Sequence, residues 1–463
     1  MATVHHSLRV AAAAVALSMV AIQGSADEPP AVPWRVTGAI DVVFNGLQTP
    51  DAFSSAVQAA GGEIVFSLDG LGVATVRGLS AAAVQDLALA HGGLATFEDV
   101  AVPVEATATG VGPQSPDPTE GLQFSPETEP FFGLQWGLRL IGADQAIAAG
   151  HTGHGARVAV IDSGVYYDHP DLSPNYDGGA NFFAPFCHLE PSSPPNVCDP
   201  ADPLDTVGHG TWVTGITVGA VNGFGILGVA PETRFVALRA CGGPFPGSCP
   251  LSSVLAAIRA AADLRVDVMN LSLNCVVGVT CPDVPGLVVA LRRAVNYANG
   301  KGSLVVTVAQ NNGLNLQALP GTQKLALGEA DTALVVSAVG PDALPATLFG
   351  FAYSNYGNVV DLAAPGGSAP PMEAGMLSTF SPFAPVPPSG ARVLPGGLFA
   401  ISGGTSAAAP HVSGAAALLV GHHGHLPPAL LRTLLEVSAR DVDGPGHSPF
   451  YGHGLLDAWA ALN

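Results

Sequence analysis

Short runs of apolar, mostly β-branched residues recur from about residue 133 to the C-terminus. They do not alternate strictly with polar residues, which is typical of parallel strands buried on both faces. Helical segments such as 252–264 and 286–298 separate several of them. This order predicts an α/β domain over residues 133–463, with a doubly wound, mostly parallel sheet. The predicted strands are 158–162, 235–239, 266–273, 304–309, 334–339 and 359–363, and the proline-rich stretch 366–395 is predicted to be a surface insertion.

Three segments precede this domain. Residues 1–26 are predicted to be a secretory signal peptide, because the apolar run 10–22 is too short to span a bilayer and Gly24-Ser25-Ala26 suits a cleavage site. A buried N-terminal helix is the alternative. Residues 32–104 show the order β-α-β-β-α-β, which is typical of a small ferredoxin-like α+β domain. Residues 105–131, rich in proline, glycine, threonine and glutamate without periodicity, are predicted to be a linker.

The chain carries 36 acidic and 16 basic residues, a formal net charge of −20. This charge argues against nucleic acid as a partner, because binding to phosphates needs a basic surface. Apolar residues make up 48% of the chain. After the signal peptide, however, no uncharged apolar run reaches the roughly 20 residues that a membrane-spanning helix needs. We therefore expect a secreted, extracellular protein without a membrane span, and we expect a monomer.

Six cysteines lie in three close pairs: Cys187 and Cys198, Cys241 and Cys249, and Cys275 and Cys281. An exported protein can form disulfides. Six cysteines allow fifteen pairings in principle, and we predict the pairing of nearest neighbours. Each such disulfide would stabilise the fold by roughly 2 to 3 kcal/mol in the chain-entropy description. A zinc site is the alternative, although the CxxC spacing typical of such sites is missing.

Three motifs contain residues that could carry chemistry. The sequence Val-Ala-Val-Ile-Asp-Ser-Gly places Asp162 at the C-terminal end of a predicted buried strand, where α/β sheets build their sites. In Gly-His-Gly-Thr, His209 is flanked by glycines, so that other backbone can approach it closely. In Gly-Thr-Ser-Ala-Ala-Ala-Pro-His, Ser406 begins a predicted helix, whose N-terminus favours a developing negative charge.

Each of these residues also has a purely structural interpretation. Asp162 could cap a helix after a strand, His209 could be a hydrogen-bonded polar residue, and Ser406 could be an N-cap. His209 lies 47 residues after Asp162, and Ser406 lies 197 residues after His209. Only a fold could bring the three together, and each lies where a doubly wound sheet places active residues.

Together the motifs resemble those of the subtilisin-like serine peptidases (subtilases), and Asp, His and Ser follow one another in the order known for subtilisins. The resemblance covers most of residues 136–461. It includes Asp162-Ser163-Gly164, His169-Pro170-Asp171-Leu172, Gly208-His209-Gly210-Thr211, Gly228-Val229-Ala230-Pro231, Asn270-Leu271-Ser272-Leu273, Asn311-Asn312-Gly313, Ala364-Pro365-Gly366, Gly404-Thr405-Ser406 and Tyr451-Gly452-His453-Gly454. More weakly, residues 32–104 resemble the inhibitory propeptide of the family.

The resemblance implies a secreted serine endopeptidase that is made as a zymogen, inhibited by its own propeptide, and that acts on polypeptides through an acyl-enzyme. His209 would be the general base, oriented by Asp162, and Ser406 the nucleophile. Asn311 and the Ser406 N–H would stabilise the oxyanion. Substrate would pair with strand edges. By resemblance, one wall of the P1 pocket is Leu271, Ser272, Leu273 and Asn274, and the opposite edge strand contains Gly242 and Gly243.

Two departures from the family pattern concern the P1 pocket. Asn274 and Gln310 stand where relatives usually have glycine. Amide side chains there should narrow the pocket or add polar groups, so we expect a P1 preference displaced from large aromatic residues. The resemblance also implies a structural calcium ion held by Asp171 and Asn222, with backbone carbonyls near Ala220, Phe224 and Ile226 completing an all-oxygen shell. The alternative for Asp171 is a turn cap.

Other interpretations remain. A non-catalytic subtilase-like scaffold is one, since Asn274 and Gln310 could impair the site. An α/β-hydrolase esterase is excluded, because Ser406 lies in Gly-Thr-Ser-Ala-Ala and not in a Gly-x-Ser-x-Gly motif. His411 is predicted to be a packed or capping residue. His422, His423 and His425 are predicted to lie in a solvated loop, with a metal cluster as the alternative.

Overall fold

The computed structural model describes residues 34–104, 129–189, 198–243, 247–321, 323–330, 332–348, 350–384 and 391–463. All of them belong to one compact unit, Pro33–Asn463. The predicted signal peptide and residues 105–128 of the predicted linker lie outside the described residues.

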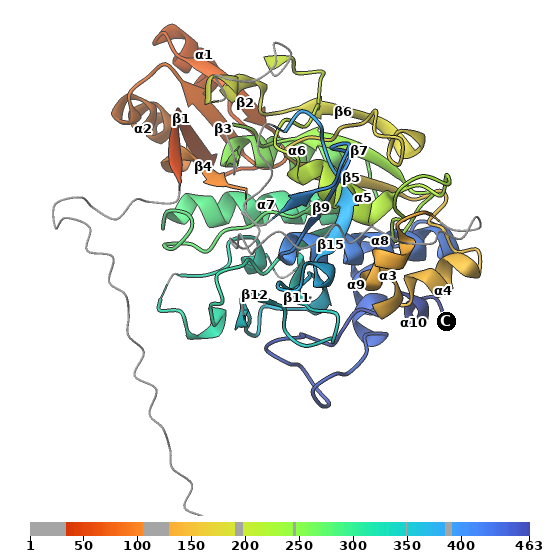
Figure 1. The fold of residues 1–463 in the computed structure, drawn as a ribbon. Coiled ribbons are helices and arrows are strands. Elements are labelled where there is room, and N and C mark those ends of the chain that lie inside the picture. The colour runs from red at the N-terminus through yellow and green to blue at the C-terminus, as the bar shows by residue number, and fades with distance from the viewer. Residues whose placement is uncertain are drawn as a thin grey trace, which may run out of the picture. The chain divides into compact units, whose positions relative to one another are not determined.

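A parallel sheet, formed by seven strands among the described residues, lies at the centre of the fold (Figure 1). The strand order is β14-β11-β10-β9-β5-β7-β6, and every neighbouring pair is parallel. The predicted α/β class with a mostly parallel sheet is therefore confirmed. The strands are β5 (Arg157–Asp162), β6 (Tyr176–Asn181), β7 (Arg234–Arg239), β9 (Val268–Leu271), β10 (Leu304–Val308), β11 (Leu334–Val339) and β14 (Leu362–Pro365).

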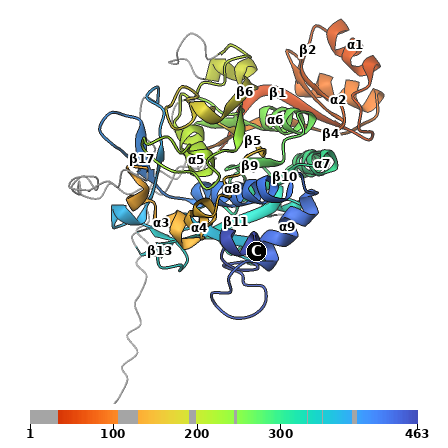
Figure 2. The ribbon, with the colours of Figure 1, turned by 90° about the vertical axis from the view of Figure 1, so that its right-hand side faces the viewer.

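Helices cover both faces of this sheet, which is why its strands are apolar without alternation. Ala159 and Ile161 of β5 belong to a core shared with α6 (Leu251–Asp263) and α7 (Pro285–Lys301). Val158 faces the opposite core, with α8 (Thr405–His423) and α9 (Pro428–Val437). Figure 2 shows these two layers with the strands between them. The other α-helices of the C-terminal domain in the described residues are α3 (Trp136–Leu140), α4 (Ala143–Ala148), α5 (His209–Val218) and α10 (Ala458–Ala461).

The first described residues form the predicted ferredoxin-like arrangement. Its elements are β1 (Arg35–Phe44), α1 (Asp51–Ala59), β2 (Glu63–Leu68), β3 (Val73–Arg77), α2 (Ala81–Ala90) and β4 (Gly93–Pro103). The strands are antiparallel in the order β2-β3-β1-β4. One face of this sheet packs against α1 and α2. The other face, including Val43, Val73 and Phe97, packs against α6 and α7.

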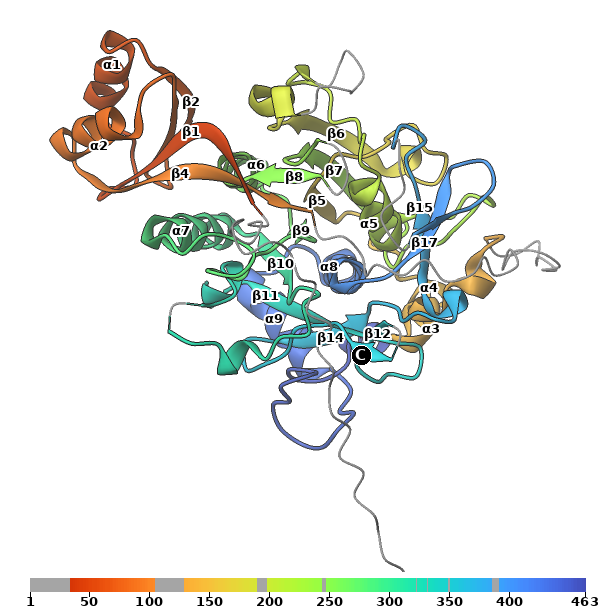
Figure 3. The ribbon, with the colours of Figure 1, turned by 60° about the vertical axis from the view of Figure 1, so that its left-hand side comes forward.

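Strand β4 extends beyond this unit and pairs with a short strand, β8 (Ser248–Pro250), immediately before α6 (Figure 3). Ala101 pairs with Pro250, Val102 with Cys249 and Pro103 with Ser248, all antiparallel. The last strand of the N-terminal unit therefore adds to an edge of the C-terminal domain.

The prediction of a surface insertion over 366–395 is wrong in part. Strand β15 (Met376–Thr379) is buried and pairs with β17 (Phe399–Ser402), which also pairs with β16 (Arg392–Val393). Proline and glycine around β15 mark the turns that place it against α5. Among these residues, a buried strand of only four residues is difficult to recognise in the sequence. The other short elements are β12 (Thr347–Leu348), β13 (Phe351–Ala352) and 3-10 helices at Phe132–Leu134, Ser173–Asn175, Ala184–Leu189, Leu316–Ala318, Leu327–Glu329 and Met372–Ala374.

The three predicted disulfides are present, joining Cys187 to Cys198, Cys241 to Cys249 and Cys275 to Cys281. The alternative of a zinc site made by these cysteines is therefore wrong. Within the described part of the chain, no helix is both long enough and apolar enough to cross a membrane.

Candidate active site

Asp162, His209 and Ser406 each lie at an end of a main element, on the edge of the sheet where the parallel strands finish. Asp162 is the last residue of β5, His209 is the first residue of α5, and Ser406 is the second residue of α8. Gly208 and Gly404 precede the two helices with φ of +95° and +145°, a region that L side chains rarely adopt. The two glycines thus allow the chain to turn directly into each helix.

The carboxylate of Asp162 binds the imidazole of His209. Asp162 Oδ1 lies 2.8 Å from His209 Nδ1 and also accepts a hydrogen bond from Ser163 N at 2.7 Å. Both side chains are buried. A Cβ on Gly210 would collide with the carbonyl oxygen of Gly164, so glycine is required where α5 approaches β5. With Nδ1 donating to Asp162, Nε2 is the nitrogen that can accept a proton.

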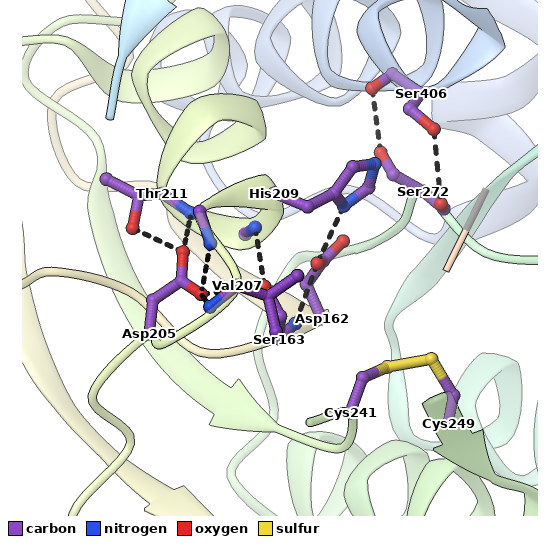
Figure 4. A network of polar contacts seen from close by, with 12 residues as sticks. Asp162, Ser163, Asp205, Val207, His209, Thr211, Cys241, Cys249, Ser272 and Ser406 are labelled. Carbon is purple, nitrogen blue, oxygen red and sulfur yellow. Dashed lines mark hydrogen bonds and ion pairs between the residues drawn. A yellow bond between two sulfur atoms is a disulfide. The ribbon is translucent and has the colours of Figure 1, made fainter. Parts of the chain in front are cut away.

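Ser406 lies on the other side of the imidazole. Figure 4 shows the His209 ring between the Asp162 carboxylate and the paired residues Ser406 and Ser272. Ser272 Oγ donates to the Ser406 carbonyl at 2.9 Å, whereas the Ser406 hydroxyl donates to the Ser272 carbonyl at 3.4 Å. The second contact is longer than an ordinary O–H···O hydrogen bond. Little therefore opposes rotation of the hydroxyl toward His209.

Asn311 lies beside the start of α8. Its Oδ1 accepts hydrogen bonds from Thr405 N at 2.8 Å and Thr405 Oγ1 at 2.9 Å. Thr405 immediately precedes Ser406, so the amide group is fixed next to the nucleophile candidate. Because the oxygen is bound to Thr405, the amide orientation is fixed, and Nδ2 is the donor group of this side chain.

Strand β8 has an edge that pairs with an extended segment of the same chain. Beyond the β4–β8 pairing, Val104 N donates to Gly247 O at 3.1 Å. Gly242, predicted to lie in the edge strand, pairs with Ser248 inside a hairpin closed by the Cys241–Cys249 disulfide. The surface under β4 is apolar and is lined by Val100, Val102, Cys249, Leu251, Val254, Leu273, Asn274, Cys275, Leu287, Leu291 and Leu327.

The sequence model of the subtilase family matches residues 153–454 of the chain. The chain belongs to the subtilase family. It is a serine peptidase of the subtilisin type and acts on polypeptides, which argues against the scaffold alternative.

Two curated relatives illustrate this membership. The subtilase is 32% identical to the thermophilic serine proteinase of Bacillus sp. (strain AK1), over 73% of this chain and 69% of the relative. It is 32% identical to subtilisin Savinase of Lederbergia lenta, over 71% of this chain and 98% of the relative.

Solved structures show the same fold. The crystal structure of the epidermin leader peptide processing serine protease from Staphylococcus aureus matches with a TM-score of 0.70 at 23% identity, over 92% of this chain and 97% of that one. Fervidolysin from Fervidobacterium pennivorans, described as a keratinolytic enzyme, matches with a TM-score of 0.67 at 24% identity, over 92% of this chain and 60% of that one. The predicted subtilisin-like fold is thus confirmed.

The two amide residues of the subtilase's predicted P1 pocket behave differently. Asn274 turns into the protein, where Nδ2 donates to Val308 O at 3.0 Å and Oδ1 accepts from Leu327 N at 3.0 Å. The amide of Asn274 thus binds the backbone of the protein itself, although the residue also lines the apolar surface beside β4. Gln310 has φ of +76°, and its Nε2 donates to the Asn274 carbonyl. Its Oε1 accepts from Thr280 Oγ1 at 3.2 Å. The Gln310 side chain thus spans from the end of β10 to the segment after β9.

Glu129, which the sequence did not indicate, lies beside the predicted calcium ligands Asp171 and Asn222 of the subtilase. Asn222 Nδ2 donates to Asp171 Oδ1 at 3.3 Å. Glu129 Oε1 accepts from Asn222 N at 2.8 Å and Gly223 N at 2.9 Å. Glu129 Oε2 is buried without a hydrogen-bond partner in the described part of the chain. Burial raises the pKa of Asp171 to about 7, and the charge of Glu129 adds to this shift.

Four histidines lie on α8 or directly after it in the subtilase. The prediction that placed His422 and His423 in a loop is wrong, because both lie in the last turn of α8, which ends at Gly424 with φ of +81°. His425 Nδ1 lies 2.7 Å from Asp267 Oδ1. His411 is buried against the Ala407 carbonyl, as predicted, and burial lowers its pKa to about 4. No group of three or more His, Cys, Asp or Glu in the described ranges could hold a metal ion.

Proposed function

We propose that this subtilase is a secreted endopeptidase that uses Asp162, His209 and Ser406 as its catalytic triad and is made as a zymogen inhibited by residues 32–104. The observation that supports it best is the buried Asp162–His209 hydrogen bond of 2.8 Å, with Ser406 at the opposite side of the imidazole.

The reaction follows from this arrangement. Ser406 Oγ attacks the peptide carbonyl while His209 Nε2 takes its proton, and the buried Asp162 stabilises the imidazolium. Asn311 Nδ2 and Ser406 N donate to the oxyanion of the tetrahedral intermediate. His209 then gives the proton to the leaving amine, which leaves an acyl-enzyme. A water molecule repeats these steps and releases the new carboxylate.

The contacts of β4 support the zymogen proposal. An inhibitor that pairs with the substrate edge blocks it in the manner of a bound peptide, and residues 101–103 pair with β8 in this way. Asp99 anchors the same strand, since its carboxylate accepts from Ser252 N at 3.1 Å and Ser252 Oγ at 2.9 Å at the start of α6. Burial raises the pKa of Asp99 to about 6, and burial together with the charge of Asp99 also raises the pKa of the neighbouring Asp41 well above its usual value.

Self-processing tests the proposal. The full chain, expressed and exported, should cut itself just beyond β4, because residues 101–104 pair along β8 and Gly247 as an extended peptide would. N-terminal sequencing of the mature protein identifies the cut. A purified chain that keeps residues 32–104 covalently attached and hydrolyses no peptide would contradict the proposal.

The Gln310 bridge supports a P1 pocket that excludes large aromatic side chains. The change Gln310→Gly should raise kcat/KM for P1 phenylalanine relative to P1 alanine by about 10-fold. Glycine removes the carboxamide from the pocket wall and adopts φ of +76° without strain. Profiling on a peptide library measures the ratio, and Gln317→Gly, at an exposed glutamine, is the matched control. A wild-type enzyme that already prefers P1 phenylalanine or tyrosine would contradict the expectation.

The contacts of Glu129, Asp171 and Asn222 fit a structural calcium ion, because two buried carboxylates both contact Asn222 and one Glu129 oxygen lacks a partner among the described residues. Bound calcium would neutralise both carboxylates and tie the segment at Glu129 to the loop around Asn222. EDTA should therefore lower the melting temperature of the mature enzyme by about 5 °C. Calorimetry measures it, and Glu129→Gln should reduce the EDTA effect. An unchanged melting curve of the wild type would count against the site.

A further inference from the structure

Asp205 is a buried carboxylate beside the first turn of α5 that has no role in the reaction described above (Figure 4). Its two oxygens accept five hydrogen bonds. Oδ1 accepts from Ser163 Oγ at 2.9 Å, Val207 N at 2.9 Å and Gly208 N at 2.8 Å. Oδ2 accepts from Thr211 N at 2.9 Å and Thr211 Oγ1 at 2.6 Å.

These donors lie on both sides of His209. Val207 and Gly208 precede the histidine and Thr211 follows it, while Gly210 N donates at 2.9 Å to the same Ser163 hydroxyl that binds Asp205. The backbone around His209 is therefore bound to one carboxylate, directly or through Ser163. Any shift of Asp205 moves the start of α5 and the imidazole with it.

The same carboxylate also reaches the strand that carries Asp162. Ser163 directly follows Asp162, and its backbone N–H donates to Asp162 Oδ1 at 2.7 Å. Its hydroxyl donates to Asp205. Asp205 thus joins the end of β5 to the beginning of α5, and these are the two elements whose relative position sets the Asp162–His209 distance.

Helix capping alone does not require this residue. A serine or asparagine caps a helix N-terminus about as well as an aspartate, and a carboxylate is costly to bury. Burial raises the pKa of Asp205, and the hydrogen bonds from Thr211, Gly208 and Val207 oppose the shift. The buried Arg239 donates to Leu204 O and Thr206 Oγ1, on either side of Asp205, both at 3.0 Å. Such an arrangement favours a retained negative charge close to His209.

We propose that Asp205 is a positioning residue that holds the His209 imidazole in line between Asp162 and Ser406, and that its negative charge favours the imidazolium formed during the reaction. The inference rests on the proposed roles of these three residues. Asp205 itself touches neither substrate nor reacting atoms and acts through the backbone around His209.

The change Asp205→Asn tests this role. It keeps the size of the side chain but removes the charge and sets an N–H₂ group against donors. We expect kcat to fall by about 10- to 100-fold, the loss typical of a small misplacement of catalytic groups, with KM nearly unchanged. We also expect the acid limb of the kcat/KM–pH profile to move to lower pH, because the imidazolium loses a nearby negative charge. The processed enzyme is assayed on a peptide substrate, after processing by added wild-type enzyme if necessary.

Asp361→Asn is the matched control for loss of a buried carboxylate. Asp361 accepts from Val335 N at 2.7 Å and binds Arg432 just before β14, at the opposite end of the strands. This control should lower the melting temperature and leave kcat and the pH profile unchanged. The same behaviour in Asp205→Asn would overturn the proposal.

If Asp205→Asn does not fold, Ser163→Ala is tested instead. This change removes the hydrogen bond between Ser163 and Asp205 but leaves the direct hydrogen bonds from the start of α5 to Asp205 in place. A smaller fall in kcat with an unchanged pH profile supports the proposal, because Asp205 keeps its charge in this variant, and unchanged kinetics overturn it. A wild-type enzyme without any hydrolysis that depends on Ser406 would instead contradict the proposed function, and this inference with it.

Discussion

Replacement of Ser406 by alanine should lower kcat for peptide hydrolysis by about 10⁶-fold, the loss measured for the nucleophile of a subtilisin. Without the hydroxyl no acyl-enzyme can form, and the oxyanion donors and substrate groove provide only the residual rate. The fold should be unaffected, because among the described residues the Ser406 hydroxyl makes a single long hydrogen bond, with the Ser272 carbonyl at 3.4 Å. Initial rates on a peptide substrate, with a melting curve beside them, measure both quantities.

The control for this change is Ser413→Ala on the same helix. Ser413 is also buried, and its hydroxyl donates to Asn270 Oδ1 at 2.9 Å. Its loss should reduce stability by about 1 to 3 kcal/mol and leave kcat unchanged. A Ser406→Ala enzyme that hydrolyses peptides at the rate of the Ser413→Ala enzyme would show that Ser406 is not the nucleophile.

Asp162→Asn should lower kcat at neutral pH by about 10⁴-fold. The aspartate accepts a hydrogen bond from His209 Nδ1, whereas an asparagine can donate to that nitrogen and stabilise the tautomer in which Nε2 carries a proton. In that tautomer His209 cannot accept the proton of Ser406. The replaced side chain is of equal size and fully buried, so the geometry of β5 should be retained.

The change Asp457→Asn provides the comparison for Asp162→Asn. Asp457 caps α10 by accepting from Ala460 N at 2.8 Å, and asparagine caps about as well. Its activity should equal that of the wild type. A loss of less than about 10-fold in Asp162→Asn would be too small for a residue that fixes the tautomer.

Strands buried on both faces could be predicted from the sequence, because an uninterrupted apolar run is itself the signal. Strand β11 has the predicted bounds, and β5, β7 and β10 differ by one residue. Strand β6, whose sequence is Tyr-Asp-Gly-Gly-Ala-Asn, could not be predicted, since as the edge of the sheet it is only partly buried. The three-residue strand β8 could not be predicted either, because it forms by pairing with distant residues of β4.

Some residues of the candidate site could be predicted from the sequence, and others could not. Asp162, His209 and Ser406 stand in local motifs whose glycines the turns require, and these motifs are visible in the chain. The roles of Glu129 and Asp205 could not be predicted from local motifs. Their hydrogen-bond partners are distant in the sequence or are backbone groups whose positions depend on the fold. The direction of the Asn274 side chain could not be predicted for a related reason. It depends on buried backbone groups, Val308 O and Leu327 N, that only the fold brings near.

Covalent labelling shows directly whether Ser406 is an activated nucleophile. A fluorophosphonate forms a bond with a serine hydroxyl that an adjacent base activates, and mass spectrometry of the digested protein identifies the labelled residue. We predict a single modified serine, Ser406, in the processed wild-type enzyme, and no labelling in the His209→Ala enzyme. Labelling of a different serine, or none in a processed and folded enzyme, would contradict it.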